Sequence, residues 1–332
     1  MIGTAGHPSA HRYINERADL IISIGSQLEF MIKAPIQAGL ERAQVFTISS
    51  DTSRVKATVP SCEGLDGSIS EILGYLKRLR FRCNRSNGRP VDYRLERFVP
   101  QLADATDQPP AEDKPLLQSE AIATLNDALP AGGQVLFDAG NCAASALHYL
   151  SIPADTSTTI ALGMGGMGYA IGAAIGAQLG SPVRKRTTVL CGDGAFMLAG
   201  MEVHTAVDLG LPITFVVFNN GKHGMCMTRQ QLFFEGRVEC SEYARPRIAD
   251  LARGFGSDKS LWTGSASSKD ELDAVLKDLS KWNWAGPAVI ELDLAVEEMP
   301  PFAPFLGADA PTYGAADPVA PSLPAPLGAR AA

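Results

Sequence analysis

Two apolar runs, each ending in polar residues, decide the fold of this chain. Residues 187–194 read Thr-Thr-Val-Leu-Cys-Gly-Asp-Gly, and residues 213–220 read Ile-Thr-Phe-Val-Val-Phe-Asn-Asn. Short, continuous apolar runs of this kind are typical of parallel strands that helices cover on both faces. We therefore predict an α/β fold in which these runs are neighbouring strands of one parallel sheet.

Strand and helix signals alternate on both sides of this stretch. Further strands are predicted at residues 18–25, 44–49, 134–137 and 288–292, and helices at residues 68–80, 121–129, 143–150, 168–179, 201–209, 246–254 and 268–281. Such alternation is typical of parallel α/β layers. We expect two doubly wound parallel-sheet units at 1–80 and 116–298, a polar linker at 81–115 and a Pro- and Ala-rich tail at 299–332. The first unit is expected to be partial, because few elements precede its first strand.

The composition of the chain narrows the classes of function. The 332 residues are 45% hydrophobic and 20% charged, which is typical of a globular protein with a substantial core. A net charge of -7 argues against nucleic acid as a main partner. No apolar run is long enough to span a membrane, and the N-terminus lacks the features of a signal peptide. The six cysteines include no CxxC pair, so we expect reduced thiols and a cytoplasmic protein.

Residues with oxygen atoms that can bind a metal ion follow the two predicted central strands. Asp193 lies between two glycines at the end of the first strand, and Asn220 and Lys222 follow the second. The carboxyl ends of neighbouring parallel strands are where α/β sheets bind ligands. The Asp193 carboxylate, the Asn220 amide oxygen and the Lys222 carbonyl are oxygen donors of the kind that Mg²⁺ prefers, and Mg²⁺ commonly also holds phosphate oxygens. The pattern predicts a Mg²⁺ site that can hold a diphosphate.

The same residues resemble a known signature. Gly192-Asp193-Gly194 followed by Asn219-Asn220 is similar to the Gly-Asp-Gly and Asn-Asn motif of thiamine diphosphate enzymes in the acetolactate synthase and 2-oxo acid decarboxylase superfamily. Residues 162–177 resemble the family segment that cups the aminopyrimidine ring. The resemblance implies that Gly165 and Met167 contact this ring and that the Met167 side chain bends the cofactor into a V shape. It implies the decarboxylation or carboligation of a 2-oxo acid.

Further site residues are implied by this resemblance. The expected cofactor contacts are Asn141, Cys142, Gly165, Met167, Asp193, Gly194, Ala195, Asn220, Gly224 and Met225. The candidate catalytic residues are His223, Met225 and Arg229. Arg229 stands where acetolactate synthases have a Trp that helps to choose the second substrate, and it could instead pair with a substrate carboxylate. Cys142 replaces a stronger hydrogen-bond donor of the family.

One part of the family's active site has no counterpart in this sequence. The family's pyrimidine domain supplies a glutamate that hydrogen-bonds the aminopyrimidine ring and promotes proton removal from the cofactor. Residues 1–130 resemble no such domain; residues 3–8 and 19–25 instead resemble the later half of the family's central domain. We therefore expect a separate pyrimidine-domain subunit to supply the glutamate, and the active protein to be a homo- or hetero-oligomer.

Two alternatives remain open at this point. Gly163, Gly165 and Gly168 match the GxGxxG spacing of dinucleotide-binding folds, which would suggest an NAD- or FAD-binding oxidoreductase. That reading gives no reason for the glycines around Asp193 or for the two asparagines that end the next strand. The other alternative is a remnant that binds the cofactor without turnover.

Overall fold

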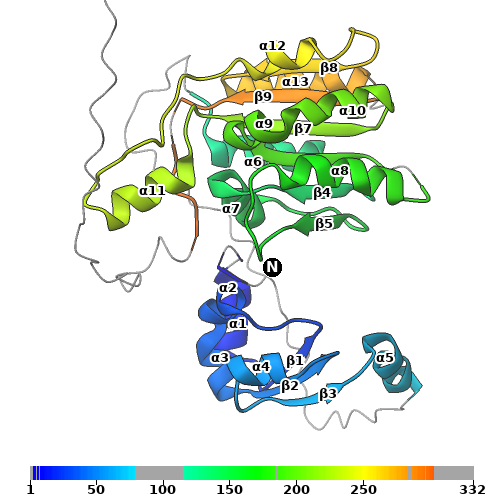
Figure 1. Cartoon of the computed structure of the whole chain (residues 1–332), viewed down its shortest axis with the longest axis vertical. Helices are drawn as coiled ribbons and strands as arrows, with labels where there is room; N and C mark the ends of the chain where they lie inside the picture. Colours follow the sequence, from blue (N-terminus) through cyan, green and yellow to red (C-terminus); the bar gives the residue numbers. More distant parts are fainter. Residues whose placement is uncertain are drawn as a thin grey trace, which may run out of the picture.

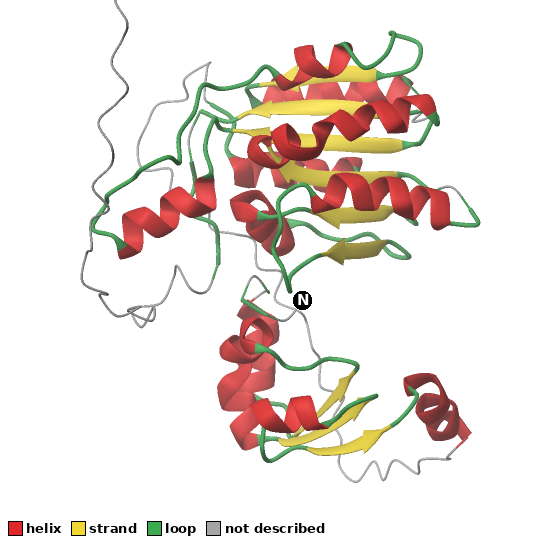
Figure 2. Cartoon of the chain, in the orientation of Figure 1, coloured by secondary structure: helices red, strands yellow, loops and turns green. Residues whose placement is uncertain are grey.

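The computed structural model describes residues 8–78, 115–183, 185–282, 286–295 and 297–302, together with residues 3, 4 and 6. Within these ranges the chain forms two parallel sheets flanked by helices (Figures 1 and 2). The predicted α/β fold with two parallel-sheet units is therefore confirmed. The predicted linker at 81–115 and tail at 299–332 lie outside the described residues, apart from residue 115 and residues 299–302.

The first sheet has three parallel strands in the order β1-β2-β3. Its elements are α1 (Pro8–Glu16), β1 (Leu20–Ile24), α2 (Phe30–Lys33), η1 (Ala34–Ile36), α3 (Gln37–Arg42), β2 (Gln44–Ser49), α4 (Ser53–Thr58), β3 (Glu63–Asp66) and α5 (Ile69–Arg78). A small core forms around Ile36, Leu40, Val45 and Val55. The alternate β1 side chains Leu20, Ile22 and Ile24 are exposed, so one face of this sheet is covered poorly by the described residues.

The second sheet has six parallel strands in the order β5-β4-β6-β7-β9-β8. Its first elements are α6 (Gln118–Ala128), β4 (Gln134–Phe137), α7 (Gly140–Tyr149), β5 (Ser157–Ile160), α8 (Tyr169–Gly180), β6 (Thr187–Gly192), α9 (Asp193–Ala199) and η2 (Gly200–Glu202). The remaining elements are α10 (Val203–Asp208), β7 (Ile213–Asn219), α11 (Gly224–Phe233), α12 (Ile248–Arg253), β8 (Trp262–Ala266), α13 (Lys269–Lys281) and β9 (Ala288–Asp293).

The two deciding runs form β6 and β7 in the middle of this sheet. Every residue of β7 is buried. Val216 and Phe218 face a core shared with α6, α7 and α13, whereas Phe215 and Val217 face a core shared with α8, α9, α10 and α12. Since alternate side chains of a strand point to opposite faces, a strand between two cores must be apolar at every position. This explains why these runs are continuous rather than alternating.

The strands that the sequence did not predict all lie at sheet edges. β3, β5 and β8 are each the outermost strand of their sheet. An edge strand is only partly covered, so it does not need a continuous apolar run. The β5 sequence, Ser-Thr-Thr-Ile, is exposed at its first three positions. Asp193, which the sequence places at the end of the first deciding strand, is the first residue of α9.

Asp138 joins the end of β4 to the start of α8. Its buried carboxylate accepts hydrogen bonds from the Gly168 and Ala170 amides, each at 2.8 Å. Gly168 has a φ of +87°, and a Cβ at this position would lie 3.0 Å from the Ala199 Cβ. The glycine is required by its left-handed backbone and by its contact with α9.

No helix in the described ranges is long and apolar enough to cross a membrane.

We expect Asp138→Ala to lower the free energy of unfolding by about 2–4 kcal/mol, because each buried amide left without an acceptor costs roughly 1–3 kcal/mol. Urea denaturation followed by circular dichroism measures the loss. Asp273→Ala is the control, since Asp273 is exposed and forms an ion pair with Lys269 on the same helix. Equal stability of the two variants would contradict the capping role of Asp138.

Candidate functional site

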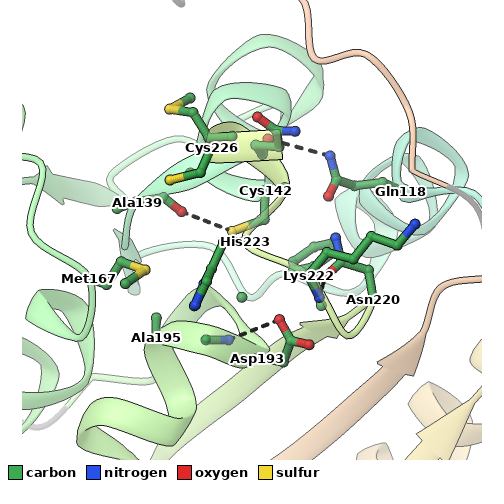
Figure 3. A pocket seen from close by; sticks show the side chains of 17 residues that line it. Gln118, Ala139, Cys142, Met167, Asp193, Ala195, Asn220, Lys222, His223 and Cys226 are labelled. Atoms are coloured by element: carbon green, nitrogen blue, oxygen red, sulfur yellow. Dashed lines mark hydrogen bonds between the residues drawn. The ribbon is translucent and has the colours of Figure 1, made fainter. Parts of the chain in front are cut away.

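A pocket lies at the carboxyl ends of β4, β6 and β7 (Figure 3). It brings together most of the predicted site residues, namely Asn141, Cys142, Met167, Asp193, Gly194, Ala195, Asn220, Lys222, His223, Gly224 and Met225. Further lining residues that the sequence did not predict are Gln118, Ala139, Gly140, Gly192, Phe218 and Cys226. In Figure 3, Asp193, Asn220 and Lys222 lie on one side of the pocket and Met167 on another. The strand register explains the convergence, because Gly192 pairs with Phe218 and the two polar segments leave the sheet together.

Two predicted residues do not line this pocket. Gly165 lies in the turn before α8 with a φ of +65°, and Arg229 is exposed on α11. The turn around Gly165 is open to solvent, with the Met164 side chain 89% exposed and the Met167 side chain 47% exposed. These large apolar side chains stand uncovered beside the pocket.

Asp193 is the central carboxylate of the site. It is 1% exposed, and it accepts hydrogen bonds from the Gly194 amide at 2.9 Å and from the Gly221 amide at 2.7 Å. Burial raises the pKa of Asp193, while the Tyr243 hydroxyl and the two amides oppose this shift. The Gly221 contact ties the loop after β7 to the end of β6, so this carboxylate sets the separation of the two segments.

The two adjacent asparagines have different environments. The fully buried Asn219 donates from Nδ2 to the Pro246 carbonyl at 2.6 Å and to Glu291 Oε1 at 2.5 Å. Asn220 lines the pocket, and its Oδ1 accepts from the Lys222 amide at 2.9 Å. Asn219 is therefore a structural residue, and only Asn220 can reach a ligand.

The oxygen donors fit a hard divalent cation. Within the described part of the chain, no three His, Cys, Asp or Glu side chains form a metal-binding cluster. A cation here would instead take the Asp193 carboxylate, the Asn220 amide oxygen and the Lys222 carbonyl, leaving positions for phosphate oxygens. This donor set matches Mg²⁺ better than zinc, because zinc sites in proteins are usually built from Cys and His.

Three helix N-termini line the same pocket. α7 begins at Gly140, α9 at Asp193 and α11 at Gly224, and the first residues of all three helices line the cavity. Free amides at helix N-termini favour anions such as a diphosphate. The Cys142 thiol contributes little, since it donates to the Ala139 carbonyl at 3.3 Å and burial raises its pKa. The pocket therefore combines cation ligands with an anion-binding surface.

The second glycine of the Gly-Asp-Gly motif makes room for His223. A Cβ on Gly194 would lie 2.9 Å from His223 Nδ1 and 3.3 Å from the Tyr243 hydroxyl oxygen. The two rings pack with centroids 5.0 Å apart. His223 Nδ1 has no hydrogen-bond partner among the described residues, and the Tyr243 hydroxyl faces the Asp193 carboxylate. Burial and the nearby Asp193 carboxylate raise the pKa of Tyr243.

Sequence reasoning missed Glu297 and the orientation of Asn141. Glu297 Oε1 accepts from Asn141 Nδ2 at 2.6 Å, and Oε2 accepts from Asn220 Nδ2. Asn141 Nδ2 also donates to Thr228 Oγ1 at 3.2 Å, so both of its N–H groups are used. The NH₂ group of Asn141 therefore faces Glu297 and Thr228, and the predicted contact of this residue with the cofactor stays a prediction. Burial raises the pKa of Glu297, and the two amides oppose that shift.

Comparison with known proteins agrees with this geometry. Residues 138–292 match the family "Thiamine pyrophosphate enzyme, C-terminal TPP binding domain". This match, which covers nearly half of the chain, supports a relationship to the superfamily of thiamine pyrophosphate enzymes. The matched range begins at Asp138 and ends in β9, so it leaves out β4 and Gln118 but contains the other strands of the second sheet and the rest of the pocket lining. Thiamine pyrophosphate is another name for thiamine diphosphate.

The curated relatives of this chain include synthases and transferases. It is 26% identical over 303 residues to the acetolactate synthase isozyme 2 large subunit of Escherichia coli, covering 89% of this chain and 51% of that protein. It is 25% identical over 280 residues to sulfoacetaldehyde acetyltransferase of Castellaniella defragrans, covering 77% of this chain and 46% of that protein. The chain spans about half the length of the curated relatives it matches.

We expect Asn219→Ala and Asn220→Ala to separate structure from binding. Asn219→Ala should cost about 2–4 kcal/mol of stability, because it leaves the buried Glu291 carboxylate and the Pro246 carbonyl with fewer donors. Asn220→Ala should destabilise the chain less but weaken Mg²⁺-dependent binding of thiamine diphosphate. Urea denaturation and calorimetric titration of both variants measure the two effects. Equal binding losses at equal stability would show that the two asparagines are not distinct.

Proposed function

We propose that this chain binds thiamine diphosphate and Mg²⁺ and takes part in the decarboxylation or carboligation of a 2-oxo acid, as in acetolactate synthase-like enzymes. The observation that carries this proposal is the convergence of Asp193, Asn220 and Lys222 with the N-termini of α7 and α11 in one pocket. The match of residues 138–292 to a thiamine pyrophosphate-binding domain supports the same cofactor. The names of the relatives support chemistry on 2-oxo acids and acyl groups in general.

The residues of the pocket divide into three proposed roles. Asp193, Asn220 and the Lys222 carbonyl would hold the metal. The backbones of Gly194, Ala195, Gly224 and Met225 would hold the diphosphate, and Gly165 and Met167 the aminopyrimidine ring. When bound, thiamine diphosphate supplies a nucleophilic carbon and an electron sink for cleavage of a carbon–carbon bond beside a carbonyl. Met225 packs against the core and also lines the pocket, so it is placed to limit access of water.

Two charged or basic residues are proposed to act on the substrate. The His223 imidazole packs over Gly194 beside Tyr243, where it can hold or move a proton at the mouth of the pocket. Arg229 follows Met225 by one turn of α11 and is exposed, so it can pair with a substrate carboxylate only when a ligand or partner approaches this helix. Both roles remain proposals.

We also propose that a pyrimidine-domain subunit completes the site. The exposed Met164 and Met167 side chains give the ring-binding wall an uncovered apolar surface. Large exposed apolar side chains gathered beside a pocket are typical of an interaction surface. A glutamate from the partner would then act on the aminopyrimidine ring. The assembly would be an oligomer of at least two kinds of domain.

The cofactor proposal predicts that thiamine diphosphate with Mg²⁺ gives a saturable calorimetric titration that chelation of the metal abolishes. Asp193→Asn should weaken this binding by about two orders of magnitude, because a charged oxygen ligand of the metal is lost. Asp250→Asn on the exposed face of α12 is the charge-matched control. Binding of NAD or FAD in place of thiamine diphosphate would instead support the dinucleotide-binding alternative.

The partner proposal predicts that this chain alone turns over no 2-oxo acid. The assay contains saturating thiamine diphosphate and Mg²⁺ and follows release of CO₂ from pyruvate and from longer 2-oxo acids. Activity is expected to appear only after a pyrimidine-domain protein is added. Substantial decarboxylation by the single chain would overturn the proposed subunit, while binding without turnover in the presence of the partner would favour a non-catalytic remnant.

A further inference from the structure

The segment after β9 returns across the carboxyl edge of the second sheet. The Leu294 amide donates to the Asn219 carbonyl at 2.9 Å, and Phe302 packs against the core that also contains Phe218. Between these points, Glu297 and Glu298 bind different partners. Glu298 accepts from the Ser119 amide and from the Ser119 hydroxyl, each at 2.8 Å, at the start of α6. Glu297 instead reaches the residues of the pocket.

The Glu297 carboxylate holds two amides at once. One oxygen accepts from Asn141 Nδ2 at 2.6 Å, and the other accepts from Asn220 Nδ2. An ionised carboxylate is an acceptor only, so each amide must turn its N–H side toward Glu297 and its oxygen away. Asn220 Oδ1 then accepts from the Lys222 amide at 2.9 Å and keeps a second lone pair. Asn141 Oδ1 is buried with no partner among the described residues.

The backbone is shaped to admit this carboxylate. A Cβ on Gly224 would lie 2.5 Å from Glu297 Oε1 and 3.1 Å from Asn141 Nδ2. The first residue of α11 must therefore be glycine for the carboxylate to reach both amides. Glu297 contacts three residues that line the pocket but does not line it itself. It stands behind the asparagines and leaves the space in front of them open for a ligand.

We propose that Glu297 is a positioning residue that fixes the Asn220 side chain with its oxygen, rather than its NH₂ group, available to the metal. The proposal rests on the proposed function, since it assigns a role toward the same Mg²⁺. The oxygen and nitrogen of an amide are similar in size, so an unrestrained Asn can present donor N–H groups to a cation. A carboxylate fixed behind the amide removes that orientation. Groups that orient metal ligands in this way commonly affect metal affinity strongly.

The first test is calorimetric titration of Glu297→Gln with thiamine diphosphate in Mg²⁺. The Gln side chain can still accept from Asn141, but its NH₂ group then faces the Asn220 NH₂ group and turns that amide around. We expect the affinity to fall about tenfold or more, as is typical when a group that orients a metal ligand is changed. Glu298→Gln is the matched control, because it removes the same charge from the same segment without contacting the pocket. Its affinity should stay near the wild-type value.

The second test is the double variant Asn220→Asp with Glu297→Gln. This exchange reverses the hydrogen bond, so that the Gln NH₂ group donates to the Asp carboxylate while the Gln oxygen still accepts from Asn141. Each single variant should bind the cofactor more weakly, and the double variant should recover most of the loss. A residue that serves only as a spacer would show no such rescue. Urea denaturation of the four proteins without ligand checks that the contact itself is restored.

Each outcome of these titrations either supports or contradicts the proposed role of Glu297. Weaker binding by Glu297→Gln with rescue in the double variant supports the proposal. Tighter binding by Glu297→Gln would overturn it and indicate that the carboxylate competes with the diphosphate, and unchanged binding would overturn it as well. A wild-type chain that binds no thiamine diphosphate would overturn the proposed function, and with it the role of Glu297 toward the metal, even if denaturation shows the Glu297–Asn220 contact to be present.

Discussion

The buried carboxylate of Asp193 links the ends of the two central strands, and the geometry of the pocket depends on this link. Its oxygens accept hydrogen bonds from the Gly194 amide, just after β6, and from the Gly221 amide, just after β7. Burying a carboxylate is costly unless its oxygens are hydrogen-bonded, so the loop after β7 is held where the Gly221 amide meets Asp193. The same oxygens remain directed to the edge where a cation can approach.

Other carboxylates repeat this arrangement around the edge of the sheet. Asp138 caps α8, Glu291 holds Asn219 and the Ala249 amide, and Glu297 holds Asn141 and Asn220. All of them accept mainly from amide N–H groups, and none forms an ion pair among the described residues. Because a carboxylate can only accept, each one also sets the direction of the amides around it. The polar edge of this sheet is therefore an ordered network in which one side chain fixes the orientation of the next.

The described residues complete one side of the pocket and leave another side exposed to solvent. The proposed metal ligands and the helix N-termini all belong to the second parallel-sheet unit, where burial and hydrogen bonds hold them in place. The turn with Met164 and Met167 is exposed, and nothing in the described ranges covers it. Under the proposed function, cofactor binding needs only the pocket, whereas turnover needs a partner.

The sequence by itself determined the parallel α/β fold and most of the pocket. Strands β6 and β7 were predictable because a strand between two cores must be apolar throughout, and their polar ends identified Asp193 and Asn220. The edge strands β3, β5 and β8 were not predictable, because a partly covered strand has no such constraint. Resemblance to a family supplied Asn141, Gly224 and Met225, which lie in the pocket, and also Gly165 and Arg229, which do not line it.

Only the tertiary structure decided which asparagine is structural and how the amides are oriented. Asn219 and Asn220 are adjacent and chemically identical, yet Glu291 binds one and Glu297 the other. These glutamates are 72 and 77 positions away along the chain, and no local pattern marks them. The position of a strand depends on burial, which leaves a local apolar pattern in the sequence. The direction of a side-chain amide depends on a distant acceptor, which becomes a neighbour only after the chain has folded.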